Sequence, residues 1–140
     1  MKAFIKKLQH TRNTSGPGAL FDLLGRVGLV AIFLLAGVSK IQAYDGSAAY
    51  MASAGIPGEL LPLVILFEIG SALAILLGYQ TRLCALAVAG FTLLTALMFH
   101  NNLADQMQFL MFWKNVAIAG GFLVLAANGA GHYSLDARRR

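Results

Sequence analysis

Charged residues are scarce in this chain: they make up 12% of its 140 residues, while hydrophobic residues make up 58%. Soluble domains are usually about 25% charged, and a domain this small must cover a large surface for its volume. The composition therefore excludes a soluble globular enzyme. It also excludes intrinsic disorder, which requires low hydrophobicity. The length allows a single domain.

Cysteine is nearly absent, since Cys84 is the only one in the sequence. One cysteine cannot form an intramolecular disulfide, which excludes a disulfide-stapled secreted fold. The same count excludes a membrane thiol oxidoreductase that works through a cysteine pair. The sequence also lacks a phosphate-binding loop, the ligand spacing of a zinc site and a Ser/His/Asp arrangement, so none of these sites is expected.

Negative charge is scarce as well: six acidic residues stand against eleven basic ones, for a net charge of +5. The basic residues do not form one patch, as nucleic-acid binding would require, but lie mostly in the two chain ends. Basic ends suit the anionic surface of a membrane. We therefore expect the lipid bilayer as a partner, and no nucleic acid.

Long hydrophobic runs are what the sequence has in abundance. Each is close to the roughly 20 residues that a helix needs to cross a ~30 Å hydrocarbon core. The sequence therefore predicts an all-α, four-transmembrane-helix bundle. The membrane domain is expected at residues 19–136, between a basic segment at 1–18 and a basic tail at 137–140. The predicted spans are residues 19–41, 60–78, 83–100 and 109–128.

The residues between the runs have turn and capping chemistry. Thr81 follows a glycine stop at Gly78 and is expected to cap the N-terminus of the third helix. In the loop after the first run, Asp45 is expected to cap a short helix that continues through Ser53 and ends at Gly55. An irregular loop is the alternative. A helix there would lie over the mouth of the bundle.

Charge asymmetry between the loops predicts the orientation. Lysine and arginine gather in the segment before the first span, in the second-to-third loop at Arg82, and in the C-terminal tail. All three fall on one side of a four-span bundle. By the positive-inside rule both termini are cytoplasmic. Segment 1–18 either lies along the lipid headgroups or is a plain tail. The acidic residues of the opposite loops are Asp45, Glu59 and Asp105.

Four charged residues lie inside or at the ends of the predicted spans. A charge near the bilayer centre costs at least about 2.5–3.5 kcal/mol, so such residues normally face the bundle interior and mark function. Helix rise places Glu68 near the middle, with Arg26 toward the cytoplasmic side and Lys114 toward the outer side. Lys40 falls at the outer end of the first span and shares a helix face with Arg26. His100 falls at the outer end of the third span.

The charge count in the spans favours a ligand, because three cations face one carboxylate and an unpaired buried cation is not tolerated. Either Lys114 is neutral, or Lys40 extends to water, or an electron-rich group binds from the outer side. A quinone carbonyl, a phenolate or a small anion would fit. The alternative is structural: Arg26 and Glu68 form an ion pair that holds two helices together, and His100 is an interfacial residue without a role. No metal site is expected, since His100 has no second ligand at helical spacing.

The order and spacing of several short motifs over about residues 20–136 resemble the DoxX family of small four-span membrane proteins. The motifs are Arg26 with Gly37-Val-Ser-Lys40, Gly55-Ile-Pro-Gly58, Leu61-Pro-Leu-Val-Ile-Leu-Phe-Glu68, Gly78-Tyr-Gln-Thr-Arg82, Gly90-Phe-Thr-Leu-Leu-Thr-Ala, Phe99-His100, Lys114-Asn115, Gly120-Gly121 and Gly131-His-Tyr-Ser-Leu-Asp136.

This resemblance implies a four-helix bundle in the bacterial inner membrane and, more loosely, redox biology. Relatives in the family are associated with quinone-linked thiosulfate oxidation and with defence against quinone or oxidative stress. The charged positions within the membrane recur as a family signature. Because this chain has no thiol pair, redox chemistry here would need a bound quinone or soluble redox proteins as partners.

The leading prediction is an inner membrane protein that binds a quinone-like or electron-rich small molecule, such as a small aromatic ligand, in the outer half of the bundle. As an enzyme it would be at most the membrane subunit of a quinone-linked oxidoreductase system. Glu68 would accept a proton from a quinol and Lys114 would polarise an oxygen. Arg26 and Asn115 would line the site. Lys40 and His100 would lie at its mouth.

Two other functions fit the same sequence. The protein could be a non-catalytic anchor that recruits soluble oxidoreductases through its tails and the Gln80–Arg82 turn. It could also be a small-molecule exporter or channel. Four helices enclose little room, so that function would need a homo-oligomer. The small residues Gly70, Ala74 and Gly78 would then form the contact between copies.

Overall fold

The computed structural model describes residues 1–4 and 16–138, and within them the chain is helical, with no strand. The all-α prediction is confirmed. Residues 5–15, which belong to the predicted basic segment 1–18, lie outside the described residues, as do Arg139 and Arg140 of the tail. The helices are α2 (Pro17–Gln42), α3 (Tyr44–Ser53), the 3₁₀ turn η1 (Gly58–Leu60), α4 (Leu61–Leu77), α5 (Thr81–Phe99), α6 (Gln106–Asn128) and α7 (Leu135–Arg138).

Four of these helical stretches are long and apolar enough to cross a membrane, which confirms the number of spans that the sequence predicts. Each begins two or three residues before its predicted start and ends within one residue of its predicted end. The helices begin earlier than the predicted spans because the first turn of a helix can be polar, and an apolar run does not include polar residues. The spans are Pro17–Gln42, Gly58–Leu77, Thr81–Phe99 and Gln106–Asn128.

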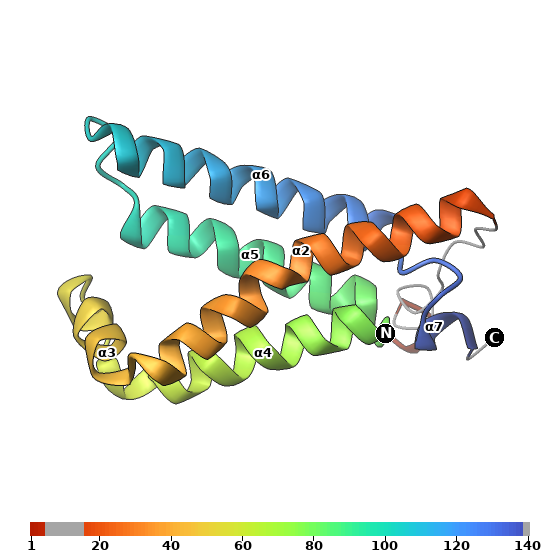
Figure 1. Ribbon diagram of the computed structural model, residues 1–140, viewed down its shortest axis with the longest axis horizontal. Helices are drawn as coiled ribbons and strands as arrows, with labels where there is room; N and C mark the ends of the chain where they lie inside the picture. Colours follow the sequence, from red (N-terminus) through yellow and green to blue (C-terminus); the bar gives the residue numbers. More distant parts are fainter. Residues whose placement is uncertain (5–15, 139–140) are drawn as a thin grey trace.

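The four spans form two antiparallel pairs, α2 with α4 and α5 with α6 (Figure 1). The pairs lie close together at the end of the bundle that carries α7, and they are spread apart at the end that carries α3 (Figure 1). We call these the α7 end and the α3 end. The start of α2 and the C-terminal segment both lie at the α7 end. Which end faces the cytoplasm stays a prediction of the positive-inside rule.

Aromatic and small residues join the two pairs at mid-bundle. The rings of Phe33 on α2 and Phe122 on α6 meet edge to face with their centroids 5.4 Å apart. Phe67 on α4 and Phe91 on α5 approach to 5.0 Å. Such contacts supply the close packing that holds helices together in lipid, where apolar burial gives little driving force. From this layer toward the α7 end the two pairs stay close together, and toward the α3 end they diverge (Figure 1).

The loop after α2 forms the short helix α3, as predicted, and Gly55 ends it with a positive φ of 81°. The predicted capping role of Asp45 is wrong. The cap is Ala43, so the helix begins two residues earlier, at Tyr44, and Asp45 lies in its first turn, where the helix dipole favours a carboxylate. Tyr50 of α3 stacks on Phe99 at the end of α5, with ring centroids 5.0 Å apart. The short helix therefore spans the open end between the two pairs.

The predicted contact face of small residues does not exist as one surface. Gly70 is exposed, with open space where a side chain would extend. Gly78, by contrast, is buried in the α4–α5 turn, and a Cβ there would collide with Ser134 of the C-terminal segment. Gly78 also has a positive φ of 73°, which an L-residue rarely adopts. Gly78 is thus used within the chain and is not available to a second copy.

Candidate functional site

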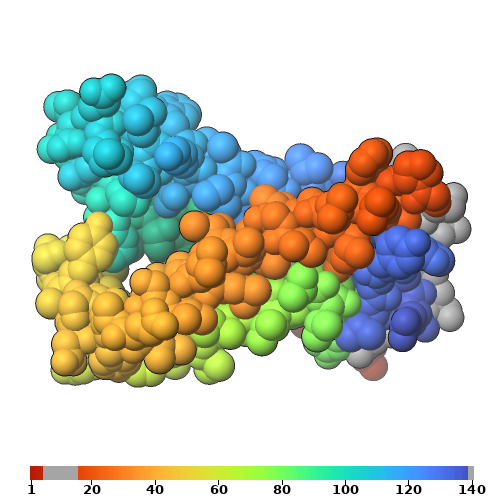
Figure 2. Space-filling model, in the orientation of Figure 1, coloured from red at the N-terminus to blue at the C-terminus, as the bar shows by residue number. Residues whose placement is uncertain are grey.

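A cavity of about 760 Å³ lies at the α3 end, between the two helix pairs and beneath α3. Figure 2 shows the molecule hollowed at this end, between α3 in yellow and the α5–α6 pair in teal and blue. All four spans and α3 contribute to its wall, and most of the lining is apolar. The polar residues that line it are Ser39, Lys40, Ser47, Tyr50, Glu68, Thr92, Thr95, His100 and Asn115.

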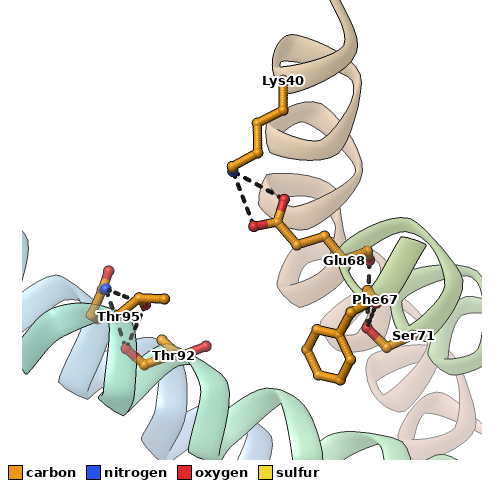
Figure 3. Close-up of polar contacts among 7 residues, drawn as sticks. Lys40, Phe67, Glu68, Ser71, Thr92 and Thr95 are labelled. Atoms are coloured by element: carbon orange, nitrogen blue, oxygen red, sulfur yellow. Dashed lines mark hydrogen bonds and ion pairs between the residues drawn. The ribbon is translucent and has the colours of Figure 1, made fainter. Parts of the chain in front are cut away.

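An ion pair between Lys40 and Glu68 forms one wall of the cavity (Figure 3). Lys40 Nζ donates to both carboxylate oxygens of Glu68, at 3.0 Å and 3.1 Å. The Glu68 side chain is 5% exposed, and that of Lys40 is 29% exposed. The two helices approach closely here because of Gly37, one turn before Lys40. Gly37 has no side chain, so α2 can pack directly against Ile69 of α4. The pair therefore joins the two helices and also presents charge to the cavity.

The facing wall carries neutral polar groups from α5 and α6. Asn115 Nδ2 donates to the Thr92 carbonyl at 3.4 Å and to Thr95 Oγ1 at 3.5 Å, which are long and weak hydrogen bonds. The two threonine hydroxyls, shown in Figure 3, donate within α5 to the carbonyls of Val88 and Thr92. Because a hydroxyl also accepts, and an amide oxygen accepts twice, this wall offers further hydrogen-bonding capacity.

His100 lies at the end of the third span, as predicted. It follows the last residue of α5 as the C-cap, and its backbone N–H donates to the Ala96 carbonyl at 3.0 Å. Its side chain is half-buried and belongs to the cavity lining. Lys40 comes from the end of α2, also as predicted, but its ammonium points inward to Glu68.

The predicted proximity of Arg26 and Glu68 is wrong. Arg26 donates through one guanidinium nitrogen to the carbonyls of Ile75 at 2.9 Å and Leu76 at 3.0 Å, and through the other to the Tyr133 carbonyl. Its side chain is 1% exposed. Arg26 and Lys40 do share the inward face of α2, but they are 14 positions apart, about 21 Å along the helix, so the two cannot meet the same carboxylate. Arg26 instead meets the C-terminal end of α4.

Lys114 also lies outside the cavity, contrary to the predicted arrangement. Lys114 is exposed on the surface of α6, whereas its neighbour Asn115 lines the cavity. Successive helix residues point about 100° apart around the axis, and of these two neighbours it is Asn115 that faces the cavity. Of the six predicted site residues, the cavity brings four together: Lys40, Glu68, His100 and Asn115.

Sequence reasoning missed Asp136, which organises the α7 end. Its carboxylate accepts hydrogen bonds from the backbone N–H groups of Gln80 and Thr81, both at 2.9 Å, and so caps the N-terminus of α5. The predicted cap, Thr81, is instead the first residue of the helix. The residues are about 55 positions apart in sequence, so no local pattern could have shown this contact.

Replacing Asp136 with alanine is expected to lower the free energy of unfolding by about 1–2 kcal/mol, because two backbone donors at the start of α5, one of them buried, lose their acceptor. Thermal unfolding in a mild detergent would measure the loss. Asp45→Ala is the matched control, since that carboxylate lies on the exposed surface of α3. An equal effect of the two substitutions would contradict the capping role.

Among the described residues, no three His, Cys, Asp or Glu side chains lie where they could hold a metal ion together. The side chains that line the cavity supply several kinds of polar group. It combines an ion pair, which can donate and accept hydrogen bonds or bind a proton, with neutral groups on the facing wall. Apolar walls strengthen each of these interactions by lowering the local dielectric constant.

Comparison with known proteins agrees with this architecture. The DoxX family model matches residues 21–101. The inner membrane protein YqjF of Escherichia coli (strain K12) is 53% identical over 114 residues, which cover 81% of this chain and 88% of the relative. The inner membrane protein YphA of the same organism is 40% identical over 123 residues, covering 83% and 88%. No solved structure matches the chain. With four membrane-spanning helices and these relatives, the chain belongs to the DoxX family and is a multi-pass protein of the bacterial inner membrane.

Proposed function

We propose that the protein binds one small molecule of the quinone class in the cavity at the α3 end. The observation that carries this proposal is the Lys40–Glu68 ion pair, which lies in the wall of a largely apolar cavity within the membrane-spanning helices. Ionisable residues inside a membrane are costly and usually functional. Ligand sites typically combine apolar walls with a few polar groups that fix orientation.

The size of the cavity supports a ligand of this class. Its volume of about 760 Å³ lies within the range of roughly 300–1,000 Å³ that small-molecule sites usually have. A quinone has an apolar ring with oxygen atoms on opposite edges. The cavity has matching features: polar groups on two facing walls, separated by apolar side chains such as Phe33, Phe91 and Ile118.

The geometry suggests a role for each polar residue. An ammonium has three N–H donors, and Lys40 directs two hydrogen bonds to Glu68, so its third N–H can donate to a quinone oxygen. Thr95 and Asn115 on the facing wall would bind the second oxygen. Glu68 would accept a proton from a quinol. In this arrangement Lys40 takes the role that the sequence assigned to Lys114.

Electron transfer to or from such a quinone would need a redox partner outside the bundle. The protein would then serve as the membrane subunit of a quinone-linked system, with a role in membrane redox metabolism or in the response to quinone and oxidative stress. Small-molecule binding is the part of this proposal that the cavity supports directly, and it is the part to test first.

The test is binding of 1,4-naphthoquinone to protein purified in a mild detergent, together with mass spectrometry of the lipids that co-purify. We expect wild type to bind the quinone and Lys40→Met to bind it at least about tenfold more weakly, because a hydrogen bond from a charged donor is lost. Lys114→Met is the matched control, since it removes a lysine outside the cavity. Absence of binding in wild type, or equal binding by Lys40→Met, would refute the proposal.

A further inference from the structure

The cavity wall carries one positive and one negative side chain, and the two charges balance each other. Among the described residues that line the cavity, Lys40 and Glu68 are the lysine and the carboxylate that pair with each other. The other titratable side chains are Tyr50 from α3 and His100 after α5. The residues that α5 and α6 contribute to the lining do not titrate. They are Phe91, Thr92, Leu94, Thr95, Met98, Phe99, Asn115 and Ile118.

We propose that this site binds acidic ligands together with one proton, which Glu68 takes up as the ligand anion contacts Lys40. This inference rests on the proposed function, because it concerns the same cavity and the same ion pair. It adds a ligand class, ionisable hydroxyquinones and similar phenolic acids, and it adds a linkage between ligand binding and pH.

The physical reason is the geometry of the pair. Both carboxylate oxygens of Glu68 lie within 3.0–3.1 Å of Lys40 Nζ, so a second anion that contacts this ammonium must lie close to the carboxylate. Two anions beside one cation repel each other strongly where water is largely excluded. A proton on Glu68 removes this repulsion. It also converts an acceptor into an O–H donor that can bind the ligand oxygen.

Glu68 is the group placed to receive the proton. Its side chain is 5% exposed, and Lys40 supplies the hydrogen bonds that the carboxylate receives in the cavity. His100 is half-buried, so a charge on it is balanced more readily by solvent. Arg26, which also lies on the inward face of α2, is held by backbone carbonyls at the other end of α4.

The charges balance in this step. Before binding, the cavity holds one ammonium and one carboxylate. One ligand anion and one proton then enter, the proton bonds to a Glu68 oxygen, and the ammonium now pairs with the ligand anion. The net charge of the cavity is zero before and after. A neutral quinone needs no proton, because it leaves the original pair intact.

The experiment compares two probes that differ in one ionisable group, 1,4-naphthoquinone and 2-hydroxy-1,4-naphthoquinone, whose hydroxyl is ionised at neutral pH. Titration calorimetry of the detergent-purified protein, in two buffers of different ionisation enthalpy, counts the protons taken up. We expect about one proton for the hydroxylated probe and none for the parent. The Kd of the hydroxylated probe should rise about tenfold per pH unit above neutrality, while that of the parent stays constant.

Two variants assign the proton to its residue. In Glu68→Gln, the amide oxygen can still accept a hydrogen bond from Lys40, and thermal unfolding in detergent reports that the protein is still folded. Proton uptake and the pH dependence of the hydroxylated probe should both disappear in this variant. His100→Gln is the matched control, in which both should persist.

The outcomes separate this inference from the function on which it rests. If the parent quinone binds but the hydroxylated one does not, the inference is overturned and quinone binding stands. The same holds if the hydroxylated probe binds without proton uptake, or if uptake persists in Glu68→Gln. If neither probe binds to wild type, both the proposed function and this inference fail.

Discussion

Replacing Arg26 with methionine is expected to lower the free energy of unfolding by about 3–5 kcal/mol, the largest effect of any single substitution considered for this chain. Arg26 is 1% exposed and donates hydrogen bonds to the carbonyls of Ile75, Leu76 and Tyr133. Two of these carbonyls, those of Ile75 and Leu76, belong to the last turn of α4, where the helix itself supplies few donors. The Ile75 carbonyl also accepts from the Gly78 backbone N–H at 3.0 Å, so it would keep one partner without the guanidinium. The carbonyls of Leu76 and Tyr133 would lose the donor that Arg26 supplies, and with it this link between α2, α4 and the C-terminal segment.

Equilibrium unfolding in detergent measures this effect. Arg26→Lys should lose less stability than Arg26→Met, because an ammonium keeps the charge near the end of α4 but cannot reach all three carbonyls with the spread of a guanidinium. Lys114→Met is the control, and an exposed substitution of this kind should change stability by about 0.5 kcal/mol or less. A folded Arg26→Met of normal stability that fails to bind naphthoquinone would instead assign Arg26 to the ligand site.

The second large effect is expected at the cavity. Lys40→Met should lower the free energy of unfolding by about 3 kcal/mol, because it leaves the nearly buried carboxylate of Glu68 without its counter-charge. Glu68→Gln should cost less, since the partly exposed Lys40 can turn toward solvent. The double variant Lys40→Met, Glu68→Gln should regain most of the loss, because no unpaired charge remains.

A double-mutant cycle of unfolding free energies tests this expectation, with naphthoquinone binding as the second readout. A stable double variant that no longer binds the quinone would show that the pair is kept for function. A coupling energy near zero would show that the two charges do not depend on each other, contrary to their bidentate geometry. A double variant that stays stable and binds the quinone normally would contradict the proposed role of the pair.

The predictions that succeeded from sequence concern single elements. The four spans followed from apolar length alone, because the bilayer requires each helix to satisfy its own backbone and to present apolar side chains to lipid. The short helix α3 followed from its glycine stop at Gly55, and the position of His100 at the end of α5 followed from helix length. Each of these depends on a short stretch of chain and on the surrounding solvent.

The predictions that failed concern contacts between elements. The sequence placed Glu68 between Arg26 and Lys114, whereas its partner is Lys40. Depth along a helix can be counted from residue number, but rotation about the helix axis and the choice of neighbouring helix cannot. Lys114 and Asn115 show the consequence, since one faces outward and the other lines the cavity. Asp136 shows it too, because its cap reaches across about 55 residues of sequence.

The sequence by itself thus determined the membrane as solvent, the all-α class, the number of spans and the positions where charge is costly. Tertiary structure alone decided which charges meet, that the two helix pairs separate at the α3 end, and that a cavity with the Lys40–Glu68 pair in its wall lies between them. The physical reason is the distance along the chain over which each effect acts. Hydropathy and helix formation act over one or two turns, whereas pairing and cavities depend on how side chains from distant segments pack.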